Sequence, residues 1–129
     1  MRLDDFERNA NAITTEGELI SRLQTVRRGE YGAFFLYHEE LFPMLSIQFN
    51  GDLAYLHYFP SEDHPGYQPC RMTPDDCESD VHFIQLDGDE ANSFDMPRET
   101  LVSVEAAYAA ATAFLHKTAL PASVSWLEL

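Results

Sequence analysis

Apolar and polar positions along the chain predict several short strands, with one helix towards each end. Strands are expected where apolar, aromatic and β-branched residues cluster in short runs bounded by turn residues. Three such runs are strong, at residues 33–37, 44–49 and 53–59. Weaker runs predict further strands at residues 81–86, 92–96 and 123–127.

Helical spacing is clear in two segments. After Thr14, Thr15 and Glu18 have the spacing of a capping box, and a helix ending before Gly29 is expected from the apolar positions Leu19, Ile20, Leu23 and Val26. Ser103 provides an N-cap for a second helix over residues 104–117. Its apolar stripe comprises Val104, Ala107, Tyr108, Ala111, Phe114 and Leu115.

Asn50-Gly51 predicts a tight hairpin between two of the strong strands, because both residues accept positive φ in a type I′ turn. A two-residue loop at this dipeptide makes Phe49 face Asp52. It puts alternate residues of both strands on one face, which we take as the core: Leu45, Ile47, Phe49, Ala54, Leu56 and Tyr58. A three-residue loop ending in Asp52 would instead turn Tyr55 and His57 inward.

Strands flanked by two helices predict an α+β fold in one domain over residues 1–129. We expect an antiparallel sheet of five or six strands, packed by the long C-terminal helix, with the N-terminal helix as an addition. Residues 60–80 contain four prolines and no periodicity, so they predict a long surface loop.

Charge is the most unusual feature of the composition. Asp and Glu number 22 against 8 Lys and Arg, which gives a formal net charge of -14. Such a surface repels nucleic acid and anionic membranes, and its natural complement is a basic partner. The alternative explanation is that the acidity serves solubility alone.

The acids are concentrated in one segment. Residues 61–99 hold 11 of the 22, balanced by Arg71 and Arg98. Together with Tyr67, Met72 and Phe94 they suit an interface with apolar anchors and a charged rim. Nine of these acids, all except Asp95 and Glu99, are the predicted partner-binding residues: Glu62, Asp63, Asp75, Asp76, Glu78, Asp80, Asp87, Asp89 and Glu90.

Candidate catalytic motifs are incomplete. His38-Glu39-Glu40 and Pro69-Cys70 begin the two halves of a zinc deaminase signature, but Thr73 stands where its second cysteine belongs. No histidine pair has metal-binding helical spacing, and Asp87-Gly88-Asp89-Glu90 lacks the remaining ligands of a calcium loop. We therefore predict no catalytic residue, metal or cofactor, and no enzyme activity.

The N-terminal residues lack the positive start and apolar run of a secretory signal, and no apolar run reaches the length that spans a bilayer. A cytoplasmic protein with reduced Cys70 and Cys77 is expected. Trp126 alternates with Val124 as in a half-buried strand, so we expect core packing for Trp126 and solvent exposure for Glu128.

The order of several segments, FPMLSIQF, GDLAYLHYF, SVEAAYAAATAFLHKTALP and VSWLEL, resembles the first-numbered immunity-protein family of bacterial polymorphic toxin systems. The resemblance covers residues 32–129, with Trp126 and Glu128 at the family's C-terminal tryptophan and acid. It implies a protein that inhibits a cognate toxin, commonly a deaminase, by tight binding. An acidic adaptor or chaperone unrelated to toxins is the alternative, and the oligomeric state stays open.

Overall fold

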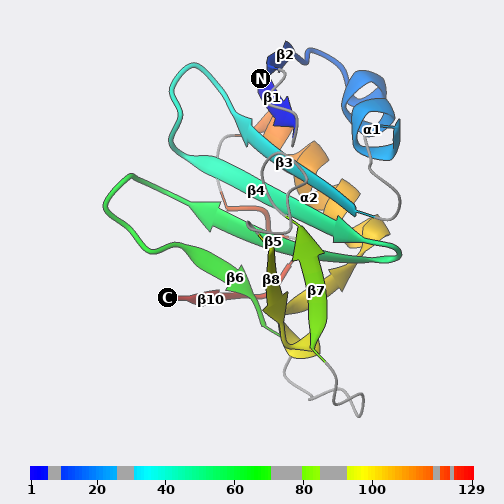
Figure 1. Ribbon diagram of the computed structural model, residues 1–129. Helices are drawn as coiled ribbons and strands as arrows, with labels where there is room; N and C mark the ends of the chain where they lie inside the picture. Colours follow the sequence, from blue (N-terminus) through cyan, green and yellow to red (C-terminus); the bar gives the residue numbers. More distant parts are fainter. Residues whose placement is uncertain (6–9, 26–30, 71–79, 85–92, 118–119, 123) are drawn as a thin grey trace.

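The computed structural model describes residues 1–5, 10–25, 31–70, 80–84, 93–117, 120–122 and 124–129 (Figure 1). Its described helices are α1 (Glu16–Thr25) and α2 (Val104–His116), with a short 3₁₀ helix at Arg98–Thr100. The first strands are β1 (Arg2–Asp5), β2 (Ala10–Ala12), β3 (Tyr31–Tyr37), β4 (Met44–Asn50) and β5 (Leu53–Phe59). The later ones are β6 (Tyr67–Pro69), β7 (Val81–Ile84), β8 (Ser93–Met96), β9 (Leu101–Ser103) and β10 (Trp126–Glu128).

The described strands form an eight-stranded sheet and a separate β7–β8 hairpin, all in antiparallel pairs. The sheet order is β10-β6-β5-β4-β3-β1-β2, and β9 also pairs with β5. The prediction of an antiparallel α+β fold is confirmed, but the predicted five or six strands are too few. The missed strands β1, β2, β6 and β9 have only three or four residues each, too short for a recognisable alternation.

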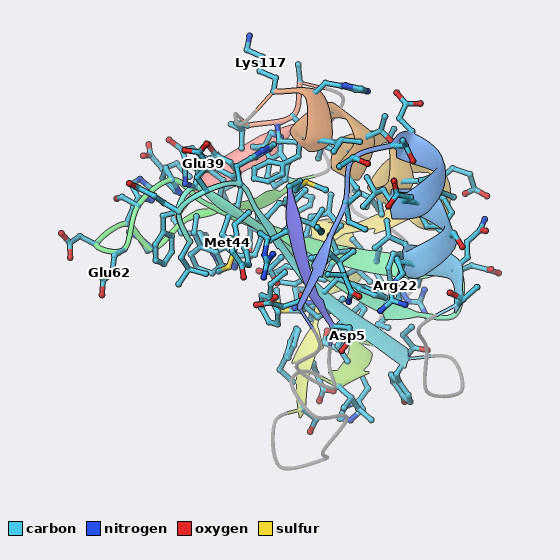
Figure 2. All side chains as sticks on the ribbon, turned by 90° about the horizontal axis from the view of Figure 1, so that it is seen from above. Asp5, Arg22, Glu39, Met44, Glu62 and Lys117 are labelled. Atoms are coloured by element: carbon cyan, nitrogen blue, oxygen red, sulfur yellow. The ribbon has the colours of Figure 1, made fainter. Side chains whose placement is uncertain are left out.

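The sheet lies between α2 on one face and the β7–β8 hairpin on the other, as Figures 1 and 2 both show. α2 packs against β4, β5 and β9, and α1 packs beside α2. The main core lies between the sheet and these helices, with Phe34, Phe49 and Phe114 fully buried. Neither helix among the described residues is long and apolar enough to cross a membrane.

The β4–β5 hairpin turns at Gly51 and Asp52, so that Phe49 faces Ala54 and Asn50 faces Leu53. The predicted register is therefore wrong by two residues. Gly51 has positive φ, at 58°. Because side chains alternate with a period of two, this shift leaves the core face unchanged, and the predicted burial of Leu45 is confirmed.

A second, smaller core explains why Tyr55 is also buried although it points away from α2. Phe83 of β7 stacks on Phe94 of β8 with ring centroids 5.6 Å apart, and Tyr55 meets Phe94 edge-on at 5.8 Å. Val81 and Leu101 complete this cluster. The sheet is thus covered on both faces at this end, and its strands carry apolar residues on both sides.

Both predicted helix starts are confirmed by their capping bonds. The Thr15 hydroxyl accepts a hydrogen bond from the Glu18 backbone N–H at 3.1 Å, and the Ser103 hydroxyl accepts one from the Ala106 N–H at 3.1 Å. These bonds satisfy backbone donors that have no partner within the first turn.

Candidate partner-binding surface

The sheet face opposite α2 presents side chains of β3, β4 and β5 in aligned rows. The register gives the rows Tyr37–Met44–Phe59, Phe35–Ser46–His57 and Ala33–Gln48–Tyr55. The β7–β8 hairpin packs on Tyr55 and leaves Phe35, Met44 and Phe59 partly exposed. These open rows form the floor of a groove of about 360 Å³, which we call the sheet groove, and Phe94 and Met96 of β8 form its wall.

Two polar side chains lie on the floor of the sheet groove. Ser46 is 3% exposed and Gln48 is 2% exposed, and the Gln48 amide donates a hydrogen bond of 2.6 Å to the Ser46 hydroxyl. That bond uses one of the two amide hydrogens. The carboxamide oxygen of Gln48 and the hydroxyl hydrogen of Ser46 have no partner among the described residues. The floor therefore keeps one acceptor and one donor available.

The part of the sheet groove that β5 contributes is aromatic and uncharged. His57 stacks on Phe59 with ring centroids 4.0 Å apart, and its Nε2 donates to the Pro65 carbonyl oxygen at 2.8 Å. Burial lowers the pKa of His57, and this effect outweighs the hydrogen bond to Pro65, which raises it. The ring is therefore neutral at pH 7. Burial also raises the pKa of Tyr55 to about 12.

The backbone of Gly66 passes close beside His57. Its φ is +102°, and a Cβ at this position would collide with the imidazole of His57 and the carbonyl oxygen of Tyr58. A glycine is therefore required where the chain enters β6. The predicted loop over residues 60–80 is wrong at this point, because β6 lies within it.

The predicted acidic surface is described in part. Glu62 and Asp63 are exposed in the loop between β5 and β6, and Asp80 is exposed immediately before β7. The other predicted partner-binding acids lie outside the described residues: Asp75, Asp76, Glu78, Asp87, Asp89 and Glu90.

A second pair of exposed acids was considered in the sequence only as part of the incomplete zinc motif, not as a contact for a partner. Glu39 and Glu40 are exposed in the loop between β3 and β4, next to Leu41, whose exposure of 51% is the largest among the big apolar side chains described. Figure 2 shows Glu39 and Glu62 at the same end of the sheet as Met44. The sequence did not indicate this proximity, since Glu40 and Glu62 are 22 positions apart.

Trp126 packs partly buried against the main core, and its indole N–H donates to the Pro121 carbonyl oxygen at 2.7 Å. It lies in β10, which pairs with β6. The bond fixes the segment after α2 onto the last strand of the sheet. These contacts favour a structural role for the indole.

We expect Trp126→Ala to lower the free energy of unfolding by about 3 kcal/mol, near the low end for large aromatic truncations because the ring is only partly buried. Urea unfolding would measure the loss, with toxin binding followed in parallel. An unchanged unfolding midpoint together with lost binding would make Trp126 an interface anchor instead.

Glu128 is held by two partners despite its exposure of 60%. The Gly66 N–H donates to Nδ1 of His64 at 2.8 Å, so Nε2 carries the hydrogen that His64 donates to the Glu128 carboxylate at 2.8 Å. The Tyr67 hydroxyl donates to the same carboxylate at 3.2 Å. The expectation of a merely solvent-exposed Glu128 is therefore incomplete, because these bonds tie β10 to the β5–β6 loop.

We expect the Glu128 carboxyl to titrate below its ordinary pKa of 4.5, since the hydrogen bonds from His64 and Tyr67 favour the charged form. The stabilisation is present above 4.5 and is lost as pH falls through the lowered pKa. Carbon-13 NMR of the side-chain carboxyl would measure the midpoint. His64→Ala should move it back up, and an unchanged midpoint in that variant would contradict the assignment.

His38, the histidine of the incomplete zinc motif, contacts helix α2. Its Nε2 donates to the Phe114 carbonyl oxygen at 2.9 Å, and its ring lies against the Phe114 ring, with centroids 5.4 Å apart. Cys70 is partly buried, while Cys77 lies outside the described residues. Among the described residues no group of three or more histidines, cysteines or acids is placed to hold a metal ion.

A sheet with an aromatic groove and with exposed acidic loops at one end is a suitable surface for binding another protein. The family model for Immunity protein Imm1 matches residues 7–128. The chain therefore belongs to the Imm1 immunity protein family, which implies toxin immunity and a cognate toxin as partner. Comparison with curated proteins gives no match.

Proposed function

We propose that this immunity protein binds and inhibits a cognate bacterial toxin, a nucleic-acid-targeting deaminase, by covering its basic substrate site. Membership of the Imm1 family is the observation that carries the proposal. The protein acts by binding alone, in the cytoplasm, and catalyses no reaction itself. Its partner is a protein, and neither nucleic acid nor a membrane is bound.

Charge supports the proposed binding mode. A toxin that acts on DNA or RNA needs a basic channel to hold the phosphate backbone. A protein with a formal net charge of -14 is attracted to the same channel, and once bound it excludes the substrate. The exposed acids Glu39, Glu62 and Asp63 project on loops, where they reach a partner without unfolding the sheet.

Co-expression with the toxin encoded beside this gene tests the proposal. We expect full growth of cells that express both proteins and arrest of cells that express the toxin alone. An unrelated toxin of the same class should still arrest growth in the presence of this protein. Arrest by the cognate toxin despite equal expression of the immunity protein would contradict the proposal and favour an adaptor role.

A further inference from the structure

We propose that the sheet groove is the surface on which the cognate toxin docks, and that the toxin inserts an apolar side chain flanked by lysine or arginine. The inference rests on the proposed function and adds to it the location of the contact and the chemistry of the segment bound. The sheet groove lies on the sheet face opposite α2. Figure 1 shows that the β7–β8 hairpin crosses only part of that face.

The shape and lining of the sheet groove suit an inserted side chain. Phe35, Met44 and Phe59 are partly exposed on its floor, and Met96 stands on its wall. Aromatic residues and methionine are enriched in the centres of protein interfaces, where a few anchors in well-packed pockets carry most of the binding energy. A volume of about 360 Å³ accommodates a large side chain of the partner together with its backbone.

The polar pair on the floor indicates a ligand with its own polar groups. Gln48 is 2% exposed, yet its carboxamide oxygen accepts no hydrogen bond from a described residue, and neither does the Ser46 hydroxyl donate one. Among the described residues Arg22 Nε alone is a buried side-chain atom without a hydrogen-bond partner, so the Gln48 carboxamide oxygen is in contact with solvent. A backbone N–H of a docked segment would replace that solvent bond, and a backbone C=O would accept from the Ser46 hydroxyl. A purely aliphatic occupant would leave both groups unpaired.

Charge at the open end of the sheet groove selects a basic segment. Glu39 and Glu40 lie on the β3–β4 loop and Glu62 and Asp63 on the β5–β6 loop, and none of the four makes an ion pair with a described residue. The β3–β4 loop leads into β4 at Met44, and the β5–β6 loop follows β5 after Phe59, which faces Met44. Lysine or arginine beside the inserted apolar residue therefore meets carboxylates from both loops.

Substitution within the sheet groove gives the first test. Met44→Arg places bulk and positive charge on the floor, and we expect it to raise the Kd for the purified cognate toxin about 30-fold or more, mainly through faster dissociation. Ala109→Arg is the matched control, because Ala109 is exposed on α2 at the opposite face and the charge change is equal. We expect it to change the Kd less than about threefold.

The unaltered protein provides a second test that does not depend on the folding of a variant. Methyl-labelled methionine spectra report Met44 and Met96 in the sheet groove. Met44→Leu and Met96→Leu assign the two signals. On addition of the toxin we expect both groove signals to shift.

The outcomes separate the two proposals. Tight binding of the wild-type protein with unchanged Met44 and Met96 signals, and with equal affinity of Met44→Arg and Ala109→Arg, would overturn the docking site and leave the proposed function intact. Absence of any binding by the wild-type protein would overturn the proposed function and the docking site with it. Loss of affinity in Met44→Arg alone, with groove signals that respond, supports both.

Discussion

Neutralising the acids on either side of β7 is expected to slow association with the cognate toxin by about tenfold or more at low salt. The two variants replace Asp75, Asp76, Glu78 and Asp80, or Asp87, Asp89 and Glu90, by their amides. Long-range attraction between an acidic protein and a basic channel accelerates encounter toward about 10⁸ M⁻¹s⁻¹, and removal of the charges removes that acceleration. The dissociation rate should change less, because rim charges act mainly on encounter.

Stopped-flow association from about 50 to 500 mM salt would measure the effect, since screening shortens the Debye length across this range. The wild-type rate should fall steeply with salt, and both variants should show a flatter dependence. Replacing Glu16, Glu18 and Glu105 on the two helices by glutamine removes three charges elsewhere, as many as the second variant removes. If that control slows association as much as the others, net charge alone governs encounter and the acidic segment has no special part.

Phe83→Ala is expected to lower the free energy of unfolding by about 3 to 5 kcal/mol, the range for a fully buried aromatic residue. Phe83 joins the β7–β8 hairpin to the sheet through its stacking on Phe94 and its contact with Tyr55. Truncation leaves a cavity in the second core, next to Tyr55 and Leu101. Urea unfolding followed by tyrosine fluorescence or circular dichroism would measure the loss.

Ser93→Ala is the control for this prediction, because Ser93 faces Ile84 on the outer side of the same hairpin. Its expected effect is within about 0.5 kcal/mol. Since Phe94 forms the wall of the sheet groove, Phe83→Ala should also weaken toxin binding. A loss of stability below about 1 kcal/mol would show that the hairpin is held to the sheet by other contacts.

The long alternating segments of the fold could be predicted from the sequence. β3, β4 and β5 each carry seven residues, and α2 has both a capping serine and a continuous apolar stripe, so local pattern and tertiary structure agree. The β4–β5 register was missed by two residues because Gly51-Asp52 serves as the turn in place of Asn50-Gly51. The core face was still correct, since it depends only on alternation.

The short strands and the second core could not be predicted, because they depend on distant partners. β1 has the sequence RLDD, in which only Leu3 contributes to the core, and its pairing with β3 is decided by contacts across more than 25 residues. The burial of Tyr55 depends on a hairpin formed by residues 81–96. Local hydrophobic pattern contains no information on which strands meet across such distances.

The candidate site could likewise be predicted from the sequence only in part. Composition identified an acidic protein that suits a basic partner, and it identified Glu62 and Asp63 as candidates for contact. It did not identify Glu39 and Glu40, which reach the same end of the sheet only after β3, β4 and β5 are aligned. The sheet groove itself combines residues from four strands, including Phe94 from the separate hairpin.

Titration of the purified cognate toxin with this protein tests the central claim most directly. Deamination of a nucleic-acid substrate is followed as the immunity protein is added. We predict a linear loss of activity that ends at a fixed small stoichiometric ratio, as expected when each toxin molecule is blocked by tight binding. Undiminished deamination in the presence of a large excess of folded immunity protein would contradict the account.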